Sequence, residues 1–351
     1  MGWYGDEIPG PYYESMPKVE LHRHLEGSLR LSTLLEIARQ QHLPLPQDAE
    51  SLSRMVQVFN GDPLHVDNFL HKFQVLRLFY RSPEIIQRIS REAVEDAALD
   101  QVRYMELRFT PVALSRQRNF ALRDVMEWVC TAVEEASRDF SLPVGLLVSM
   151  NRHEPVELAE QVTALAVEFR HRGVVGIDLA GDEFYFSAAP FLSLFRQARK
   201  DGLAVTVHAG EWGPPENVQQ AIEDFEANRI GHGITVICNE DITRLAAERG
   251  VPFEVCPTSN VQSGAVEAMF MHPLKKMLEA GLNVTINSDD PGISRIRLSD
   301  EYRVAVEVVG ISRQVLKERV LAAAQASLLP PEEKQALVQR LKIEMDTLEE
   351  T

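Results

Sequence analysis

The sequence has little cysteine and no long apolar run. Its three cysteines, Cys130, Cys238 and Cys256, are widely spaced and form no C-x-x-C pair. This argues against a disulfide framework and favours a reducing compartment. No apolar run approaches the ~20 residues of a membrane-spanning helix, and the opening residues lack the basic and apolar regions of a signal peptide. We therefore expect a cytoplasmic protein without a membrane partner.

The sequence also has fewer basic residues than acidic ones. The chain has 36 Lys and Arg against 52 Asp and Glu, a net charge of −16. This field repels a phosphate backbone, so we expect no nucleic-acid partner and favour a small neutral or cationic molecule. The 351 residues, 45% of them apolar, suit either two ordinary domains or one large barrel, and the composition leaves the oligomeric state open.

What the chain does contain is a rhythm of short apolar runs, each ending in polar residues and followed by a helical pattern. Continuous apolar runs suit parallel strands that are buried on both faces. Eight such units predict an α/β fold, a (β/α)8 or TIM barrel, with an open doubly wound sheet as the alternative. The runs are KVELHRH, VRYMELRFTP, VGLLVSMNR, VVGIDLAGDE, LAVTVHAGE, RIGHGI, VPFEVCPTSN and LNVTINSDDP.

One connection is much longer than the others. About 75 residues separate the first two runs, and most have a helical pattern. A long insertion at the active face of a barrel serves as a lid or pocket wall. We predict a single domain over 1–351, with a barrel core over 17–298 that includes a helical lid at about 30–100. Residues 299–351 should form further helices, broken at Pro330–Pro331.

Polar side chains gather at the C-terminal ends of the apolar runs, where barrel enzymes place their chemistry. His22 and His24 lie two residues apart, so they point to the same side of a strand. Three imidazoles and one carboxylate at a single mouth would bind Zn²⁺ or Fe²⁺ and leave room for a water. The residues at these ends are His22, His24, His208, Glu211, His232, Asp289 and Asp290.

We predict one metal ion per chain, bound by His22, His24, His208 and Asp289. Acid–base and orienting roles then fall to Glu211, His232 and Asp290. Each residue alone has an ordinary alternative, a buried hydrogen-bonded histidine or, at Asp289–Asp290, a turn before proline. Their joint placement favours the metal site.

Other candidate sites receive simpler interpretations. His24 and Glu26 match the H-x-E of cytidine-deaminase zinc sites, but the P-C-x-x-C partner motif is missing. The DLAGDE run carries no lysine that could bridge two metals, which favours one. We interpret Cys256 as buried packing. The remaining histidines are interpreted as structural or solvated: His42, His65, His71, His153, His171 and His272.

Six motifs taken together resemble a known family. HRHLEG, DLAGDE, HAGE, RIGHG, EVCPTSN and NSDDPG, in this order over about residues 16–310, resemble the adenosine deaminase group of the amidohydrolase superfamily. The resemblance implies a zinc-dependent hydrolase that converts adenosine and 2′-deoxyadenosine to inosine and 2′-deoxyinosine plus ammonia. Its partner would be a small purine nucleoside.

The resemblance also implies roles for individual residues. The zinc ligands match His22, His24, His208 and Asp289. Glu211 matches the glutamate that shuttles a proton at purine N1, and His232 the histidine that orients the attacking hydroxide. Asp290 would accept a hydrogen bond from N7–H, and the backbone N–H of Gly181 would bind N3. The lid would be a helix over 62–73 with the wall residues Val66, Phe69, Leu70 and Phe73, for which core packing is the competing interpretation.

One residue departs from the family pattern. Adenosine deaminases usually carry aspartate where this chain has Glu26, and that residue and His24 contact the ribose 5′-hydroxyl. Glutamate resembles relatives that act on adenine or 6-aminodeoxyfutalosine, whereas EVCPTSNVQSGAV and LVSMNRH resemble bacterial adenosine deaminases. A phosphate-bearing substrate would need a cation, for which Arg23 and Arg152 are the candidates. A different amide or ester hydrolase and a non-catalytic metal protein are the remaining alternatives.

Overall fold

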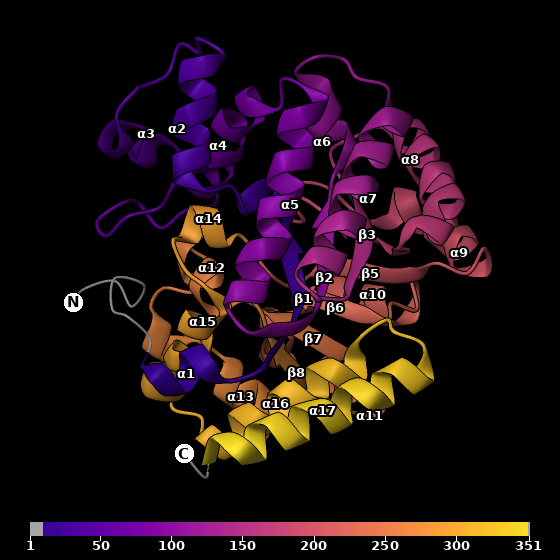
Figure 1. Ribbon diagram of the computed structural model, residues 1–351. Coiled ribbons are helices and arrows are strands. Elements are labelled where there is room, and N and C mark those ends of the chain that lie inside the picture. The colour runs from indigo at the N-terminus through magenta and orange to yellow at the C-terminus, as the bar shows by residue number, and fades with distance from the viewer. Residues whose placement is uncertain (1–9, 350–351) are drawn as a thin grey trace.

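The computed structural model describes residues 10–349, and a sheet of eight parallel strands forms its centre (Figure 1). The strands follow one another around the sheet in chain order, so the predicted barrel is confirmed. Each strand begins within one residue of the start of its predicted run, and every run except the first continues past the end of its strand. The strands are β1 Lys18–His24, β2 Val102–Phe109, β3 Val144–Asn151, β4 Val174–Ala180, β5 Ala204–Ala209, β6 Arg229–His232, β7 Pro252–Val255 and β8 Asn283–Ile286.

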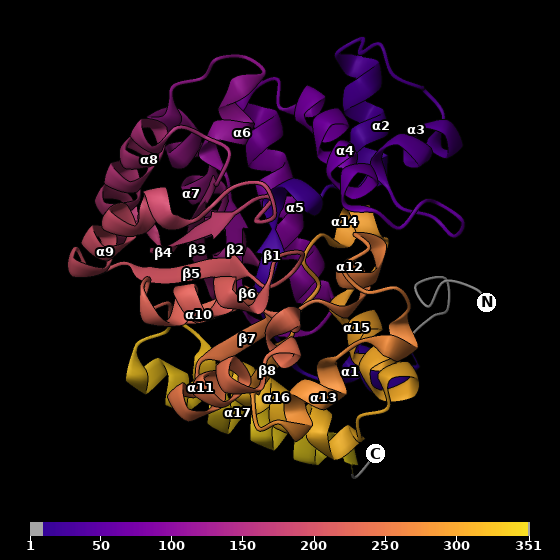
Figure 2. The ribbon, with the colours of Figure 1, turned by 180° about the vertical axis from the view of Figure 1, so that it is seen from behind.

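Helices surround this sheet and bury its outer face (Figure 2). Nearly every residue of the strands is buried, as expected where side chains pack on both faces. The helical patterns at 122–140 and 239–250 form α7 and α11, and the pattern at 156–172 is divided between α8 and η4. The helices between the strands are α5 Pro83–Leu99, α6 Pro111–Arg116, α7 Leu122–Asp139, α8 Val156–Glu168, η4 Phe169–Arg172, η5 Ala189–Phe191, α9 Leu192–Lys200, α10 Pro215–Glu223, η6 Ile234–Cys238, α11 Glu240–Arg249, α12 Pro257–Gln262, η7 Met269–Met271 and α13 Leu274–Glu279.

The segment that follows the last strand meets the first strand at Arg23, the residue between the two β1 histidines. A parallel bridge joins Arg23 to Asp289. The backbone N–H of Asp289 donates to the carbonyl of His22 at 2.9 Å, and the N–H of His24 donates to the carbonyl of Asp289 at 2.8 Å. Below this bridge, Asn287 accepts the N–H of Leu21 at 2.9 Å. The two ends of the sheet are therefore joined beside the predicted metal ligands.

The long insertion after β1 forms a helical group at one end of the barrel (Figure 1, indigo). It begins with η2 Leu25–Gly27 and continues through α2 Leu31–Gln40, α3 Ala49–Val56, α4 Val66–Leu76 and η3 Arg77–Phe79 to α5. The predicted lid helix begins at 66 rather than 62, because His65 caps it by accepting the N–H of Asp67 at 3.2 Å. Phe69 is buried on its inner face.

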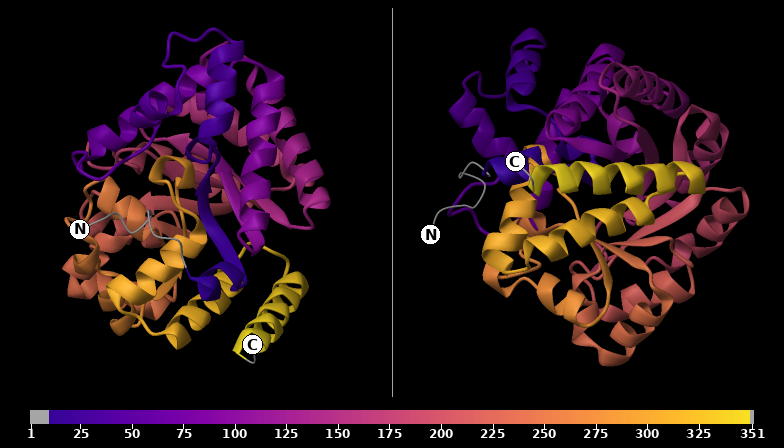
Figure 3. Two further views of the ribbon diagram at one scale, coloured as in Figure 1. Left: turned by 60° about the vertical axis from the view of Figure 1, so that its left-hand side comes forward. Right: turned by 60° about the horizontal axis from the view of Figure 1, so that its bottom comes forward.

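Both ends of the described chain pack on the opposite side of the barrel (Figure 3). At the start, α1 spans Pro11–Ser15. After β8 come α14 Pro291–Ser294, α15 Leu298–Val304 and η8 Ala305–Val309, and then α16 Arg313–Ala326 and α17 Pro331–Glu349, which are separated at the predicted proline pair. The α16 helix contacts β1 and β8 and pairs with α17. Within residues 10–349, no helix has the length and apolar character needed to cross a membrane.

A chain of buried ion pairs crosses the floor of the barrel. Glu254 on β7 accepts hydrogen bonds from Arg108 at 2.8 Å and from Arg229 at 2.5 Å. Arg229 also pairs with Glu106, and it donates to the carbonyl of Ala326 at 3.0 Å. These charged side chains are fully buried, so the free-energy cost of removing each charge from water is offset by its ion-pair partners.

We predict that Glu106→Ala lowers the free energy of unfolding by about 3–5 kcal/mol, because it leaves Arg229 buried with only one counterion. The matched control is Glu344→Ala, which removes a partly exposed partner of Arg103 and should cost less than about 1 kcal/mol. Urea unfolding followed by circular dichroism measures both. Equal losses for the two variants would contradict the prediction.

Candidate functional site

The first strand presents the two predicted β1 ligands at the mouth of the barrel. The imidazole of His22 is fully buried, and its Nδ1–H donates to Glu254 Oε2 at 2.8 Å. Its Nε2 has no hydrogen-bond partner among the described residues, although Asp289 Oδ1 lies 3.2 Å away. A buried nitrogen that faces a carboxylate without a hydrogen bond fits a metal ligand whose orientation is set by an outer carboxylate.

The four predicted ligands converge on one point. His24 Nε2 lies 3.3 Å from Asp289 Oδ1 and 3.3 Å from His208 Nε2. Donor atoms bound tetrahedrally to zinc at about 2.0–2.1 Å are themselves about 3.3 Å apart. The spacing therefore matches the edges of a tetrahedral site. Asp178 completes the orientation of His208, because its Oδ1 accepts from His208 Nδ1 at 3.2 Å.

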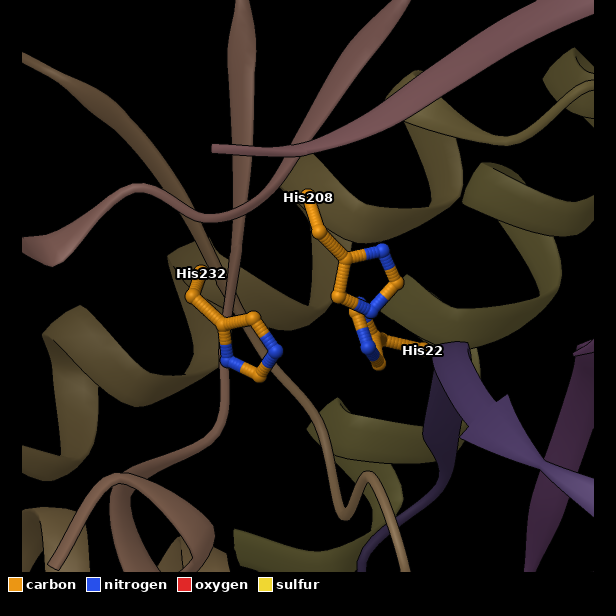
Figure 4. A group of neighbouring side chains, drawn as sticks. All are labelled: His22, His208 and His232. Carbon is orange, nitrogen blue, oxygen red and sulfur yellow. The ribbon is translucent and has the colours of Figure 1, made fainter. Parts of the chain in front are cut away.

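His232 lies against the same cluster. In Figure 4 the rings of His22, His208 and His232 turn toward a shared space, and their ligand nitrogens lie within 4.8 Å of one another. His232 Nε2 is 3.5 Å from Glu211 Oε2 and 3.9 Å from Asp289 Oδ2, and its Nδ1 faces Asn260 Nδ2 at 3.1 Å. His232 can therefore bind a metal ion itself, or it can hydrogen-bond a group that is bound to a metal ion at this cluster.

Two of the histidines, His24 and His232, and the central carboxylate have pKa values shifted toward the forms that bind a cation. Burial lowers the pKa of His24 and of His232 well below the usual range, which leaves both imidazoles neutral. Burial acts to raise the pKa of Asp289, but the adjacent imidazole of His22 outweighs it and holds that pKa well below normal. Neutral imidazoles and an ionised carboxylate are the forms that bind divalent metals.

Two other carboxyl groups in the site behave in the opposite way. Burial, followed by the charges of Asp289, Glu183 and Asp290, raises the pKa of Glu211 well above its usual value. Burial and the charge of Asp289 do the same to Asp290, whose Oδ1 has no hydrogen-bond partner among the described residues. The site therefore combines a carboxylate whose pKa is lowered with two carboxyl groups whose pKa values are raised, which is a typical arrangement for acid–base chemistry.

A cavity of about 350 Å³ opens from these residues toward the helical insertion. Phe69, Leu70 and Phe73 on α4 line it, as predicted for a lid. Val66 does not line it, and instead borders an adjoining hollow, because it lies one turn before Phe69 at the start of the helix. The other predicted site residues that line the cavity are His24, Glu26, Gly181, His208, Glu211, His232, Asp289 and Asp290.

Two glycines make room for this arrangement. A Cβ atom on Gly27 would lie 1.7 Å from Asp290 Oδ1, so only glycine lets the Asp290 side chain occupy its position. Gly181 follows β4 with φ of +93°, a conformation that glycine adopts without strain. These contacts explain why a glycine ends the HRHLEG motif and why another lies within DLAGDE.

The arginine that lines the cavity is neither of the two candidates for binding a phosphate-bearing substrate. Arg23 points to the outside of the barrel and donates to Ser28 Oγ at 3.0 Å, and Arg152 donates to the backbone carbonyl of His208. Neither lines the cavity, but Arg77 does. Both expectations were wrong because they rested on distance along the sequence from a strand end, whereas Arg77 belongs to the insertion.

Two outer carboxylates were also missed. Glu254 orients His22 and Asp178 orients His208, and both lie inside strands that are otherwise apolar. An acidic residue within a strand buried on both faces is a signal that could have found them, since a buried charge needs a partner.

The residues interpreted as structural mostly fit that interpretation. His272 is buried and its Nε2 faces Asn260 Oδ1 at 3.2 Å. Burial raises the pKa of the Cys256 thiol well above normal, so the thiol stays neutral as packing requires. His153 is the exception, because it lines the cavity.

Comparisons with known proteins agree with this geometry. The sequence pattern of the family described as adenosine deaminase matches residues 17–344. An adenosine deaminase of Klebsiella pneumoniae is 37% identical over 328 residues, which cover 93% of this chain and 98% of that protein. An adenosine deaminase of Shigella flexneri is 36% identical over the same shares of the two chains.

Solved structures share the whole fold. An amidohydrolase from Burkholderia ambifaria with bound Zn has a TM-score of 0.89 at 27% identity, covering 98% of this chain and 95% of that one. An adenine deaminase from Arthrobacter aurescens has a TM-score of 0.86 at 27% identity, with 93% and 98% covered. The Arabidopsis N6-mAMP deaminase has a TM-score of 0.83 at 31% identity, with 96% and 99% covered.

We predict that the protein binds a divalent metal and that His208→Ala weakens zinc binding by more than about 100-fold. Loss of an outer hydrogen-bond partner weakens metal binding by up to about 100-fold, and loss of a ligand should cost more. His171→Ala, at an exposed histidine whose Nδ1 hydrogen-bonds the backbone carbonyl of Glu168, is the control and should bind zinc normally. Metal content after dialysis and titration calorimetry measure the effect. A normal zinc content in His208→Ala would exclude His208 as a ligand.

Proposed function

The chain belongs to the adenosine deaminase family, and we propose that its cavity catalyses the metal-dependent hydrolytic deamination of adenosine and 2′-deoxyadenosine. The products are inosine or 2′-deoxyinosine and ammonia. We further propose that the protein is a single domain, since α16 packs directly on β1 and β8. Its three free cysteines and its net charge of −16 support a cytoplasmic enzyme of small molecules rather than of nucleic acid.

We propose one zinc ion, with iron(II) as the alternative, held by His22, His24, His208 and Asp289. The partnerless Nε2 of His22 and the donor spacings of 3.2–3.3 Å support this set. Such an ion supplies a water whose pKa is lowered toward about 7 and which is therefore nucleophilic at neutral pH.

The observation that carries the proposal is the buried carboxyl of Glu211, which lies in the cavity 3.5 Å from His232 Nε2 and beside the ligand cluster. A purine ring accepts a nucleophile at C6 only if electrons can move to N1, and a proton on N1 makes this possible. Glu211 lines the cavity, and burial raises its pKa well above normal, which favours the protonated form that can donate to N1. A metal site alone would suit many hydrolases, whereas a carboxyl group of raised pKa beside it suits proton donation to a ring nitrogen.

The neighbouring groups complete the reaction. Asp290 faces the ring at N7, the backbone N–H of Gly181 faces N3, and His232 orients the attacking oxygen. The C6–O bond forms, the bond from C6 to the amino nitrogen breaks, and one water proton ends on N1 while the other leaves with ammonia. Phe69 and Phe73, whose ring centroids are 6.2 Å apart, cover the apolar faces of the substrate and exclude water.

We predict that Glu211→Gln keeps zinc and substrate binding but lowers kcat by about 10²–10⁴-fold, the range for loss of a general acid. The fall in ultraviolet absorbance when adenosine becomes inosine measures kcat, and elemental analysis measures zinc. Glu223→Gln, on the exposed side of α10, is the matched control and should retain full activity. Turnover near the wild-type rate in Glu211→Gln would end this assignment.

A second candidate substrate is a 6-aminopurine with a different or acidic substituent, such as adenine, 6-aminodeoxyfutalosine or an N6-substituted adenine nucleotide. Two features support it. Glu26 Oε1 accepts the N–H of Thr110 at 2.6 Å while Oε2 has no hydrogen-bond partner among the described residues, and burial raises its pKa to about 7. Arg77 lines the same part of the cavity and its charge acts on Glu26.

We predict that Arg77→Met distinguishes these substrates. If an acidic substituent is bound, kcat/KM for that substrate should fall by about 10–100-fold, the worth of a hydrogen bond to a charged group. The value for adenosine should stay within about two-fold, because no charge is lost there. Arg81→Met, in the same connection but outside the cavity lining, is the control. Assays with adenosine, 2′-deoxyadenosine, adenine and 6-aminodeoxyfutalosine decide between the candidates.

A further inference from the structure

The loop that carries Glu211 is built around a buried carboxylate from another connection of the barrel. Glu183 lies in the connection after β4 and is 6% exposed. Its Oε1 accepts the backbone N–H groups of Glu211 at 2.6 Å, Trp212 at 2.9 Å and Gly213 at 3.0 Å. Its Oε2 accepts the N–H of Gly210 at 2.9 Å. Four consecutive amides therefore point at one side chain.

A side-chain donor completes the set. Asn217 in the first turns of α10 donates from Nδ2 to Glu183 Oε2 at 2.8 Å. All five partners are donors, which suits an ionised carboxylate, since it can only accept hydrogen bonds. Consecutive amides that converge on an anion form a nest, and the anion holds the backbone in that conformation. Glu183 is therefore the internal anion of the β5–α10 loop.

The loop has been shaped to receive this carboxylate. A Cβ atom on Gly213 would lie 2.7 Å from both Glu183 Cδ and Oε2, so a larger residue could not approach. Gly210 has φ of +72°, which turns its N–H toward the carboxylate. On the other side of the loop, Thr235 donates its N–H to the carbonyl of Gly210 and its hydroxyl to the carbonyl of Gly213, both at 2.9 Å.

Glu183 also connects two parts of the proposed substrate site. It follows Gly181 by two residues, and the proposed function places Gly181 at one edge of the purine ring and Glu211 at another. The five hydrogen bonds fix the distance between these two contacts. A shift of about 1 Å in a catalytic group can cost about 100-fold in rate, so the position of the Glu211 backbone matters for catalysis.

We propose that Glu183 is a positioning residue, whose carboxylate gathers the amides of residues 210–213 and thereby holds the carboxyl of Glu211 against the ring of the substrate. This inference rests on the proposed function for its catalytic consequence. Its structural consequence, that the loop loosens without this anion, does not depend on the substrate.

Glu183→Gln tests the inference with the full-length, zinc-loaded enzyme. Glutamine has nearly the same shape, but its NH2 group would face N–H donors whichever way it turns, so the loop should lose two or three hydrogen bonds. We expect kcat for adenosine to fall by about 10–100-fold while KM changes less than about three-fold, because the other contacts to the substrate remain. The zinc content should stay at the wild-type level.

Two further variants make the test specific. Glu183→Asp keeps the charge and should recover part of the lost kcat, although its shorter side chain reaches fewer amides. Asp100→Asn is the matched control: Asp100 is a buried carboxylate that accepts the N–H and hydroxyl of Ser299, and it does not line the cavity. It should lower stability without changing kcat.

A readout without substrate separates this inference from the proposed function. Trp212 belongs to the loop, and its indole N–H donates to Ser263 Oγ at 3.2 Å. Its fluorescence, taken as the difference from Trp212→Phe, should become more accessible to acrylamide in Glu183→Gln. If the wild type does not deaminate adenosine, the proposed function fails, and the fluorescence still decides whether Glu183 holds the loop.

Three results would overturn the inference. One is a wild-type kcat in zinc-loaded Glu183→Gln, which would make Glu183 purely structural. Another is loss of zinc in parallel with activity, which would place the effect at His208 instead of Glu211. The third is unchanged quenching of Trp212, which would show that the loop keeps its conformation without the carboxylate.

Discussion

The backbone bridge that joins β8 to β1 is the constraint on which the site depends. Asp289 donates its N–H to His22 and accepts the N–H of His24, so the carboxylate is fixed between the two imidazoles of the first strand. Residues separated by more than 260 positions in the chain meet because the sheet returns to its first strand. In an open sheet, β1 and β8 would lie at opposite edges and no such cluster would form. Asp289 adopts a φ of +61°, an uncommon conformation that this bridge maintains.

Around this bridge, the barrel separates charges into two layers. The floor holds Arg108 and Arg229 with Glu254 and Glu106, which form ion pairs with one another. The mouth holds imidazoles and carboxyl groups whose charges are only partly compensated. Glu254 joins the layers, because it pairs with the floor arginines and also orients His22. The stability of the floor and the geometry of the mouth therefore share one side chain.

Three separate connections supply much of the wall of the mouth. The insertion after β1 supplies the aromatic wall and Arg77, the β4 connection supplies Gly181 and Glu183, and the β5 connection supplies Glu211. Glu183 ties the second of these to the third through hydrogen bonds to four amides. The first connection has no comparable tie to the others in the part of the chain described here. Substrate choice can therefore vary through the insertion while the catalytic groups stay in register.

The sequence by itself determined the strands, the barrel and which polar residues meet. Each strand is a run of apolar residues with a polar end, and strand alternation places His22 and His24 on one side, so local patterns were sufficient. The tertiary structure alone decided what each side chain touches. Arg23 faces outward, Arg152 binds a backbone carbonyl, Arg77 reaches the cavity from a helix, and Val66 falls outside it. The direction in which each of these side chains points depends on how helices from distant parts of the chain pack over the barrel. A local sequence pattern does not specify that packing.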